Sequence, residues 1–162
     1  MKLEGTHKIT APLEAVWRKL MDPAVLRRAM PGCEKLEEIG QHRYRTVLKA
    51  GVGPIKGTFN GEVTLSDIVH EKSYTLTSRV TSNVGFVEGV GRVQLESFAG
   101  ETIVRFSGEA KIGGMLASVG ARLVEAAAQK NMRDTFANLA RELSAGSFAG
   151  PGAAPGTPPA VA

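Results

Sequence analysis

Histidine and cysteine are the side chains with which a small protein most often binds a metal or acts as a nucleophile. This sequence has three histidines, His7, His42 and His70, and one cysteine, Cys33. A zinc site needs such residues clustered at short spacings, whereas these four are scattered along the chain. A reactive thiol also needs an electropositive, partly exposed setting, and Cys33 opens a predicted strand. We therefore expect no metal ion and no catalytic nucleophile.

Two glycine-rich stretches superficially resemble phosphate-binding loops. The first, GVGPIKG at residues 51–57, contains a proline and precedes a strand rather than a helix. The second, EGVGRVQ at residues 88–94, lacks the third glycine and lies within a predicted strand. A nucleotide-binding loop needs a strand before it and a helix after it, so neither stretch predicts nucleotide binding.

Polar side chains on the inward face of the predicted sheet are the remaining candidates for chemistry. His7 shares the apolar register of the first strand and could bond a ligand carbonyl, or it could be a structural histidine. Tyr44, Tyr74 and Ser78 share the inward face of later strands. They could orient the polar head of a ligand or satisfy hydrogen bonds at a cavity rim. Paired carboxylates for general acid–base catalysis are not found on this face.

These residues must be positioned by a simple order of elements. Apolar and polar residues alternate over residues 3–9, which predicts a strand. Two short helices, each with an apolar face, are predicted between this strand and Pro31. Turn residues then divide residues 33–112 into about six strands. A helical pattern then covers about residues 115–143. One long helix must cover the apolar face of one sheet. The order predicts an α+β domain over residues 1–144, in which a curved antiparallel sheet of about seven strands wraps around a long C-terminal helix. Residues 145–162, rich in Ala, Gly and Pro, predict a disordered tail.

Small residues are concentrated where sheet and helix should meet. Glycines occupy inward positions of the strands, and the helix begins after Gly113-Gly114 and contains Gly120. Protein interiors pack densely, so these positions indicate either bends of a coiled sheet or an apolar ligand cavity. The predicted wall of that cavity consists of Met30, Leu48, Phe59, Gly61, Val63, Leu76, Val80, Phe86, Gly91, Val93, Leu95, Val104, Phe106, Met115, Leu116, Val119, Gly120 and Leu123.

Charge and composition restrict the partners. The single cysteine excludes an intramolecular disulfide and is typical of a protein from a reducing compartment. The net charge of +4 permits attraction to anionic partners but does not select among them. The N-terminus reads as a strand rather than a signal peptide, and no stretch approaches the roughly 18 apolar residues of a membrane span. We expect a cytoplasmic protein. Its basic residues Arg18, Lys19, Arg27 and Arg28 form either a solvated surface or a docking surface. Nucleic-acid binding is not expected, because the aromatic residues face inward.

Three segments resemble the CoxG family of carbon monoxide dehydrogenase subunits, within the START-like helix-grip (SRPBCC) superfamily. They are DPAVLRRAMPGCEKLEEIG at residues 22–40, KGTFNGEV at residues 56–63 and IGGMLASVGARLV at residues 112–124. The resemblance implies a helix-grip fold with a deep cavity between sheet and helix. It also implies an accessory protein without covalently held cofactors, which assists a molybdenum-hydroxylase CO dehydrogenase at the inner face of the membrane and handles an apolar lipid such as menaquinone.

Residues and resemblance together predict a non-catalytic protein that binds a quinone, or another isoprenoid or lipid, in its cavity. Two alternatives stay open at this point. A polyketide cyclase or hydrolase-like enzyme would need a titratable group deep in the cavity, for which His7 is the candidate. A ligand-free adaptor would instead recruit its partner to the membrane through the basic short helices.

Overall fold

The computed structural model describes residues 1–148, with side chains described through residue 144. All seven strands form one antiparallel sheet in the order β1-β7-β6-β5-β4-β3-β2. The strands are β1 (Lys2–Ile9), β2 (Cys33–Gly40), β3 (Arg43–Val52), β4 (Ile55–Val69), β5 (Ser73–Ser82), β6 (Gly85–Phe98) and β7 (Glu101–Gly113). The helices are α1 (Leu13–Leu20), α2 (Pro23–Ala29), the 3₁₀-helix η1 (Gly114–Val119) and α3 (Ala121–Phe148).

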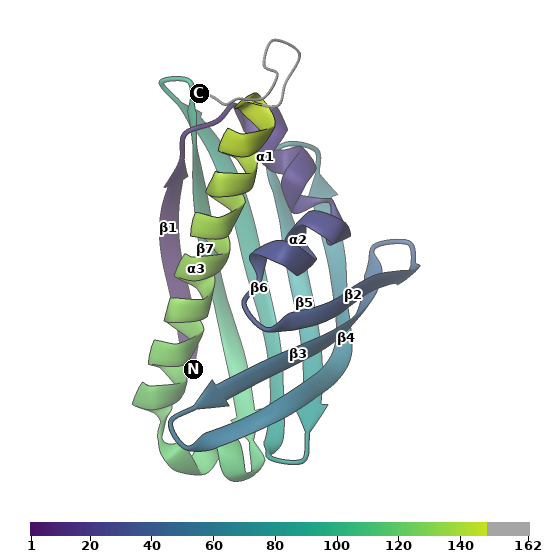
Figure 1. The fold of residues 1–162 in the computed structure, drawn as a ribbon, viewed down its shortest axis with the longest axis vertical. Coiled ribbons are helices and arrows are strands. Elements are labelled where there is room, and N and C mark those ends of the chain that lie inside the picture. Colours follow the sequence, from purple (N-terminus) through teal and green to yellow (C-terminus); the bar gives the residue numbers. More distant parts are fainter. Residues whose placement is uncertain (149–162) are drawn as a thin grey trace.

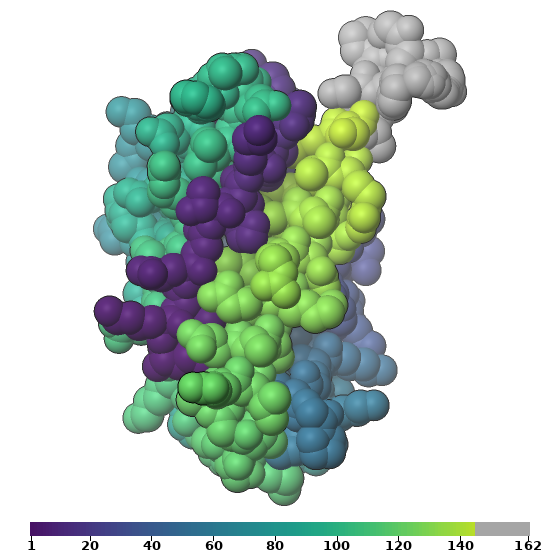
Figure 2. All heavy atoms as spheres, turned by 90° about the vertical axis from the view of Figure 1, so that its left-hand side faces the viewer, coloured from purple at the N-terminus to yellow at the C-terminus, as the bar shows by residue number. Residues whose placement is uncertain are grey.

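The sheet curls around the long helix. In Figure 1, α3 runs along the front of β1, β7 and β6, while β2, β3 and β4 curve forward beside it and α1 and α2 cover the upper end. Figure 2 shows α3 on the surface between β1 and the blue strand region around residue 50. The predicted fold class, a curved seven-stranded sheet around a C-terminal helix after two short helices, is confirmed.

The hairpin turns lie where the turn residues predicted them. β2 and β3 meet around Gly40-Gln41, and β3 and β4 meet at Gly53-Pro54. Gly53 and Gly100 adopt φ angles of 59° and 80°, a region that glycine enters without the steric cost of a Cβ atom. Strand pairing continues without shifts between β3 and β4 and between β5 and β6, so the alternation of inward and outward residues is kept along these strands.

The long helix differs from its prediction at both ends. A continuous helix from about residue 115 was expected, but residues 114–119 form η1, and Gly120, with a φ of 99°, separates η1 from α3. Gly120 is therefore a break between helices rather than a glycine inside one. At the other end α3 runs to Phe148, past the predicted end near residue 143. The rest of the predicted tail lies outside the described residues.

The short helices are fixed to α3 by polar contacts. The Asp22 carboxylate accepts a hydrogen bond from the Ala24 amide at 3.0 Å and so caps α2. Arg28 of α2 binds Glu142 of α3 through two hydrogen bonds of 2.7 and 3.1 Å. The basic cluster of the short helices thus includes one residue that joins α2 to α3.

The apolar core is divided into two clusters. The larger one lies beneath α1 and contains the buried residues Val16, Trp17, Val104 and Leu139, among others. The smaller one contains Phe59, Val80 and Leu116 and lies toward η1. Both clusters lie on the concave side of the one sheet.

Candidate functional site

A cavity of about 710 Å³ lies between the concave face of the sheet and α3. Its walls come from the inward residues of β3 to β7, from α2 and the segment that follows it, and from one side of α3. Inward residues are set by strand register: Tyr44 is paired with Val63 on β4, and Val63 with Ser78 on β5. Directly paired residues of antiparallel strands share a face, so these side chains gather on one concave surface.

Many of the residues predicted for the site border this cavity. They are Met30, Leu48, Phe59, Val63, Leu76, Val80, Val93, Phe106 and Leu116, together with the polar residues Tyr44, Tyr74 and Ser78. Ligand binding by these side chains stays a prediction.

Three predicted wall glycines do not border the cavity. A Cβ atom on Gly91 would lie 2.7 Å from the ring of Phe106, and one on Gly61 would collide with the backbone of β5 around Arg79. A Cβ atom on Gly120 would point into open space. The strand glycines therefore allow close packing and curvature of the sheet, which was the alternative explanation for them, and the ligand space lies elsewhere.

Five other predicted wall residues also lie away from the cavity. Leu95 and Val104 belong to the larger core cluster beneath α1 and are not part of the cavity wall. Phe86 is paired with Gly113 and Thr81 on the outward register of β6, and its ring occupies the space that a side chain at Gly113 would need. Met115 and Leu123 are 57% and 52% exposed to solvent.

Val119, the last residue of η1, is likewise not part of the cavity wall. The reason is the break at Gly120, which resets the helical phase. An uninterrupted helix would carry Val119 and Leu123 on one face, one turn apart. After the break, Val124 faces inward instead and is 7% exposed.

Sequence reasoning missed the middle of α3. Val124, Ala127, Ala128, Asn131 and Thr135 all border the cavity. Their spacing of three and four residues is that of one helix face, so the signal was present in the sequence. It was hidden by the assumption that the face continued in phase from residue 115.

The charged residues that border the cavity are held in ion pairs. Lys130 binds Asp134 at 2.6 Å within α3, and Lys49 of β3 lies 3.1 Å from Glu34 of β2. The side chains of both lysines are largely exposed, which places their charges at the edge of the cavity. The remaining wall is dominated by aliphatic and aromatic side chains, with a few hydroxyl groups.

His7 lies beneath α3 but does not border the cavity. Its ring stacks on Phe136 of α3 with the centroids 4.4 Å apart, and its Nε2 atom is buried without a hydrogen-bond partner among the described residues. Burial, and secondarily the charge of Arg133, lowers the pKa of His7 below its ordinary value of 6.5. The candidate titratable group thus packs between β1 and α3 and does not reach the ligand space.

Cys33 has a structural environment. Its thiol donates a hydrogen bond to the Lys35 carbonyl at 3.4 Å, and burial raises the pKa of the Cys33 thiol. A raised pKa keeps the sulfur protonated and poorly nucleophilic. Within the described part of the chain, histidine, cysteine and carboxylate side chains do not gather into a group that could hold a metal ion.

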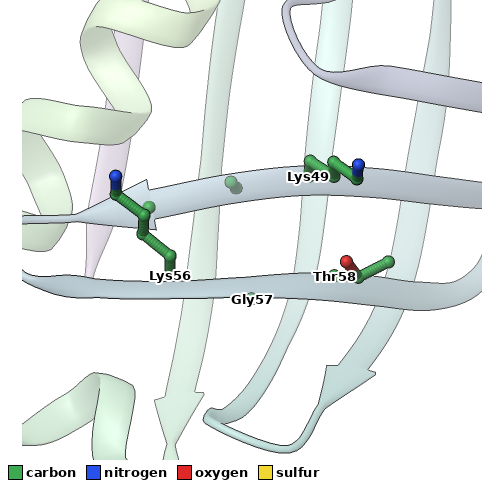
Figure 3. A pocket seen from close by; sticks show the side chains of 6 residues that line it. Lys49, Lys56, Gly57 and Thr58 are labelled. Atoms are coloured by element: carbon green, nitrogen blue, oxygen red, sulfur yellow. The ribbon is translucent and has the colours of Figure 1, made fainter.

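A second hollow, of about 430 Å³, lies along the β3–β4 hairpin (Figure 3). Lys49, Lys56 and Thr58 project from neighbouring strands around it, beside Gly57. These residues, apart from the half-buried Gly57, are exposed, so the hollow has no wall that could enclose a ligand. The cavity between sheet and helix is therefore the candidate site. None of the described helices is long and apolar enough to cross a membrane.

Solved structures with the same fold include proteins of several kinds. A conserved protein from Geobacillus kaustophilus superposes with a TM-score of 0.86 at 28% identity, covering 90% of this chain and 97% of that chain. The Zhui aromatase/cyclase from Streptomyces sp. R1128 matches with a TM-score of 0.67 at 17% identity, covering 94% and 98%. A START superfamily protein from Mycobacterium smegmatis matches with a TM-score of 0.66 at 10% identity, covering 89% and 97%.

The latter two likenesses establish the fold alone, a START-like helix-grip fold. No protein with a curated description matches the sequence. The CoxG family, named for a subunit of carbon monoxide dehydrogenase, matches residues 5–144, nearly all of the part whose side chains are described. The chain therefore belongs to the carbon monoxide dehydrogenase CoxG family.

Proposed function

We propose that this protein is an accessory, non-catalytic binding protein that holds a long apolar molecule, a quinone or another isoprenoid lipid, between its sheet and α3. The observation that carries the proposal is the cavity of about 710 Å³ with its mainly apolar wall. That volume lies within the range of roughly 300–1,000 Å³ typical of small-molecule sites.

A dry, closed void of this size would be strongly destabilising. At roughly 24 cal/mol per Å³ of empty space, a dry cavity of about 710 Å³ would cost about 17 kcal/mol. That exceeds the net stability of a typical domain, about 5–15 kcal/mol. Water can fill the space from the open side, but water needs two or more polar partners to be well held. An apolar ligand that displaces this poorly held water gains affinity.

Exposed apolar residues near the start of α3 support loading from a membrane. Met115 and Leu123 are more than half exposed, and Lys111 and Arg122 precede them closely in the chain. Neither cation forms an ion pair among the described residues. Apolar side chains beside free cations suit the surface of an anionic bilayer. We therefore propose that this end of the molecule contacts the inner face of the cell membrane.

Membership of the CoxG family supports a link with CO dehydrogenase. We propose that the protein assists a molybdenum-hydroxylase CO dehydrogenase by bringing it an apolar redox lipid, with menaquinone as the first candidate. The redox chemistry would then belong to the enzyme, and the chain would contribute binding and release.

The two alternatives have less support. A cyclase or hydrolase needs a titratable group facing its substrate. His7 packs outside the cavity, and Asp134 is bound to Lys130. A ligand-free adaptor working through the basic short helices would leave the cavity without a role. Of those cations Arg28 is bound to Glu142, whereas Arg18, Lys19 and Arg27 form no ion pair among the described residues.

Organic-solvent extraction of the protein from a quinone-producing host, followed by mass spectrometry, tests ligand binding. We expect an isoprenoid quinone or lipid in near-stoichiometric amount. Ala127→Phe, which fills part of the cavity, should lose the ligand. Ala126→Phe, one residue away on the exposed face of α3, should keep it. Extracts without lipid, together with no uptake of added menaquinone, would refute the binding function.

Vesicle flotation tests the membrane surface. Vesicles containing phosphatidylglycerol should carry the wild-type protein, and Leu123→Gln should weaken this binding. Val90→Gln is the matched control, because Val90 is equally exposed, at 54%, but lies on the outward register of β6, paired with Glu109. Equal flotation of both variants would contradict the assignment of this surface.

A further inference from the structure

Two buried tyrosines border the ligand cavity from different strands. Tyr44 on β3 is 8% exposed and Tyr74 on β5 is 4% exposed. Both belong to the cavity wall. They are also among the few polar side chains on a surface that is otherwise mainly apolar.

Their hydroxyl groups have no hydrogen-bond partner among the residues whose side chains are described. Among residues 1–144, neither phenol takes part in a hydrogen bond. The enclosed polar atoms without a partner are His7 Nε2 and His42 Nδ1, so the two tyrosine oxygens are still reachable by a small molecule.

The other buried hydroxyls in the described part of the chain have hydrogen-bond partners, unlike those of the two tyrosines. Thr46 donates to the Lys35 carbonyl at 3.1 Å, and Thr102 donates to the Ala11 carbonyl at 2.8 Å. Buried tyrosine hydroxyls usually find a partner as well. The hydroxyl groups of Tyr44 and Tyr74 are left to bond water or a ligand in the cavity.

Both phenols remain hydrogen-bond donors at neutral pH. Burial raises the pKa of Tyr44, and the nearby Glu38 carboxylate raises it further. Burial, with a smaller effect of Tyr44, raises the pKa of Tyr74 far above its ordinary value. The Tyr74 ring is also held in place, because it meets the edge of Trp17 with centroids 5.9 Å apart. Each oxygen therefore carries a proton that a ligand acceptor can receive.

An uncharged acceptor suits these donors better than a charged one. The lysines bordering the cavity, Lys49 and Lys130, are paired with Glu34 and Asp134. The terminal ammonium of Met1, a residue that also borders the cavity, donates a hydrogen bond to the Ala110 carbonyl at 3.0 Å. A ligand charge would therefore have to displace an existing contact to gain a counter-ion, and burying an unpaired charge is strongly unfavourable. A carbonyl oxygen, by contrast, accepts hydrogen bonds without carrying a charge.

We propose that Tyr44 and Tyr74 form the subsite that receives the carbonyl-bearing head of the apolar ligand, so that the protein selects quinone-like lipids over hydrocarbons of the same shape. This selection rests on the proposed ligand-binding function and adds its polar determinant. The remaining cavity wall then holds the isoprenoid chain.

The experiment compares two probes that differ only in their carbonyl groups. The first is menaquinone with a geranyl side chain, and the second is the corresponding geranyl methylnaphthalene, which lacks both oxygens. Trp17, the single tryptophan of the sequence, adjoins Tyr74 and reports quinone binding through fluorescence quenching. The hydrocarbon is measured by its displacement of the bound quinone.

We expect the wild type to bind the quinone more tightly than the hydrocarbon. Tyr44→Phe and Tyr74→Phe should each weaken quinone binding about two- to tenfold and leave the hydrocarbon affinity unchanged. Thr77→Val, on the exposed face of the same strand as Tyr74, is the control and should change neither affinity. Because each Phe variant removes a single oxygen, its fold can be checked by an unchanged thermal midpoint without ligand.

The outcomes distinguish failure of the tyrosine subsite from failure of the proposed ligand-binding function. If both probes bind and the Phe variants change neither affinity, or change both equally, the tyrosine subsite is refuted while the binding function stands. If neither probe binds, both proposals fail. A selective loss of quinone affinity in the Phe variants supports the subsite.

Discussion

The cavity can be tested in solution without knowledge of its ligand, by comparing two leucines. Leu139 is fully buried in the larger core cluster beneath α1, with 0% exposure, and does not border the cavity. Leu116 is nearly as buried, at 4%, but borders the cavity. Leu→Ala at each position removes the same atoms from similar burial. The two variants therefore differ mainly in what the removed side chain leaves behind.

At Leu139 the truncation creates a new void, whereas at Leu116 it enlarges a space that already exists. The cost of truncating a buried leucine rises with the void created, from about 2.7 to 5 kcal/mol. We expect the free energy of unfolding to fall by about 3–5 kcal/mol for Leu139→Ala and by about 2–3 kcal/mol for Leu116→Ala.

Urea unfolding of delipidated protein measures this difference. With an m-value of about 2 kcal/mol per molar urea, a gap of about 1.5 kcal/mol places the two midpoints roughly 0.7 M apart. Each protein should first be unfolded on an affinity resin, washed free of lipid and refolded. A bound lipid then cannot stabilise one variant selectively. Equal losses, or a larger loss for Leu116→Ala, would mean that the cavity is closed in solution and that the cavity-based reasoning is wrong.

Three further predictions follow from individual contacts. The pKa of His7 is lowered in the folded state, so the contribution of His7 to stability is complete above pH 6.5 and is lost as the pH falls through the folded pKa. The urea midpoints at about pH 8 and about pH 5.5 should therefore differ more for wild type than for His7→Phe. The same difference in both proteins would contradict the role of His7. The hydrogen bond from Arg28 lowers the pKa of Glu142, so the stability that this pair adds is present above pH 4.5 and is lost as the pH falls further. The difference in unfolding free energy between wild type and Glu142→Gln should therefore shrink in acid and in high salt. A difference that depends on neither pH nor salt would refute the pairing. Gly91→Ala places a Cβ atom 2.7 Å from the Phe106 ring and should lower the free energy of unfolding by about 1–3 kcal/mol. In a Phe106→Leu background this loss should be smaller. An equal loss in that background would show that the ring is not the obstacle.

The elements of this fold were predictable because they depend on local patterns. Alternation of apolar and polar residues defines the strands, and residues such as Gly53-Pro54 set the turns between them. The buried face of α1, with Val16, Trp17 and Leu20, follows from helical spacing alone. One sheet and one long helix leave a single way to cover the apolar face, so the architecture was determined as well.

The wall of the cavity was only partly determined by the sequence. Inward residues of regular strands, such as Phe59 and Val80, were placed correctly because register carries the alternation from strand to strand. Phe86 was misplaced, since near a strand end the face depends on the register set by the turn. Leu123 was misplaced because the break at Gly120 changes the helical phase.

What the glycines do was decided only by the tertiary structure. A glycine in a strand indicates either the close approach of another group or an unfilled space. The sequence alone does not distinguish these two possibilities. At Gly91 the Phe106 ring occupies the space, whereas the open volume lies beside Ala127 and Ala128 of α3. The sequence by itself determined which elements form and which faces they bury. How closely those faces approach depends on packing between residues far apart in the chain, and this packing decides where the cavity lies.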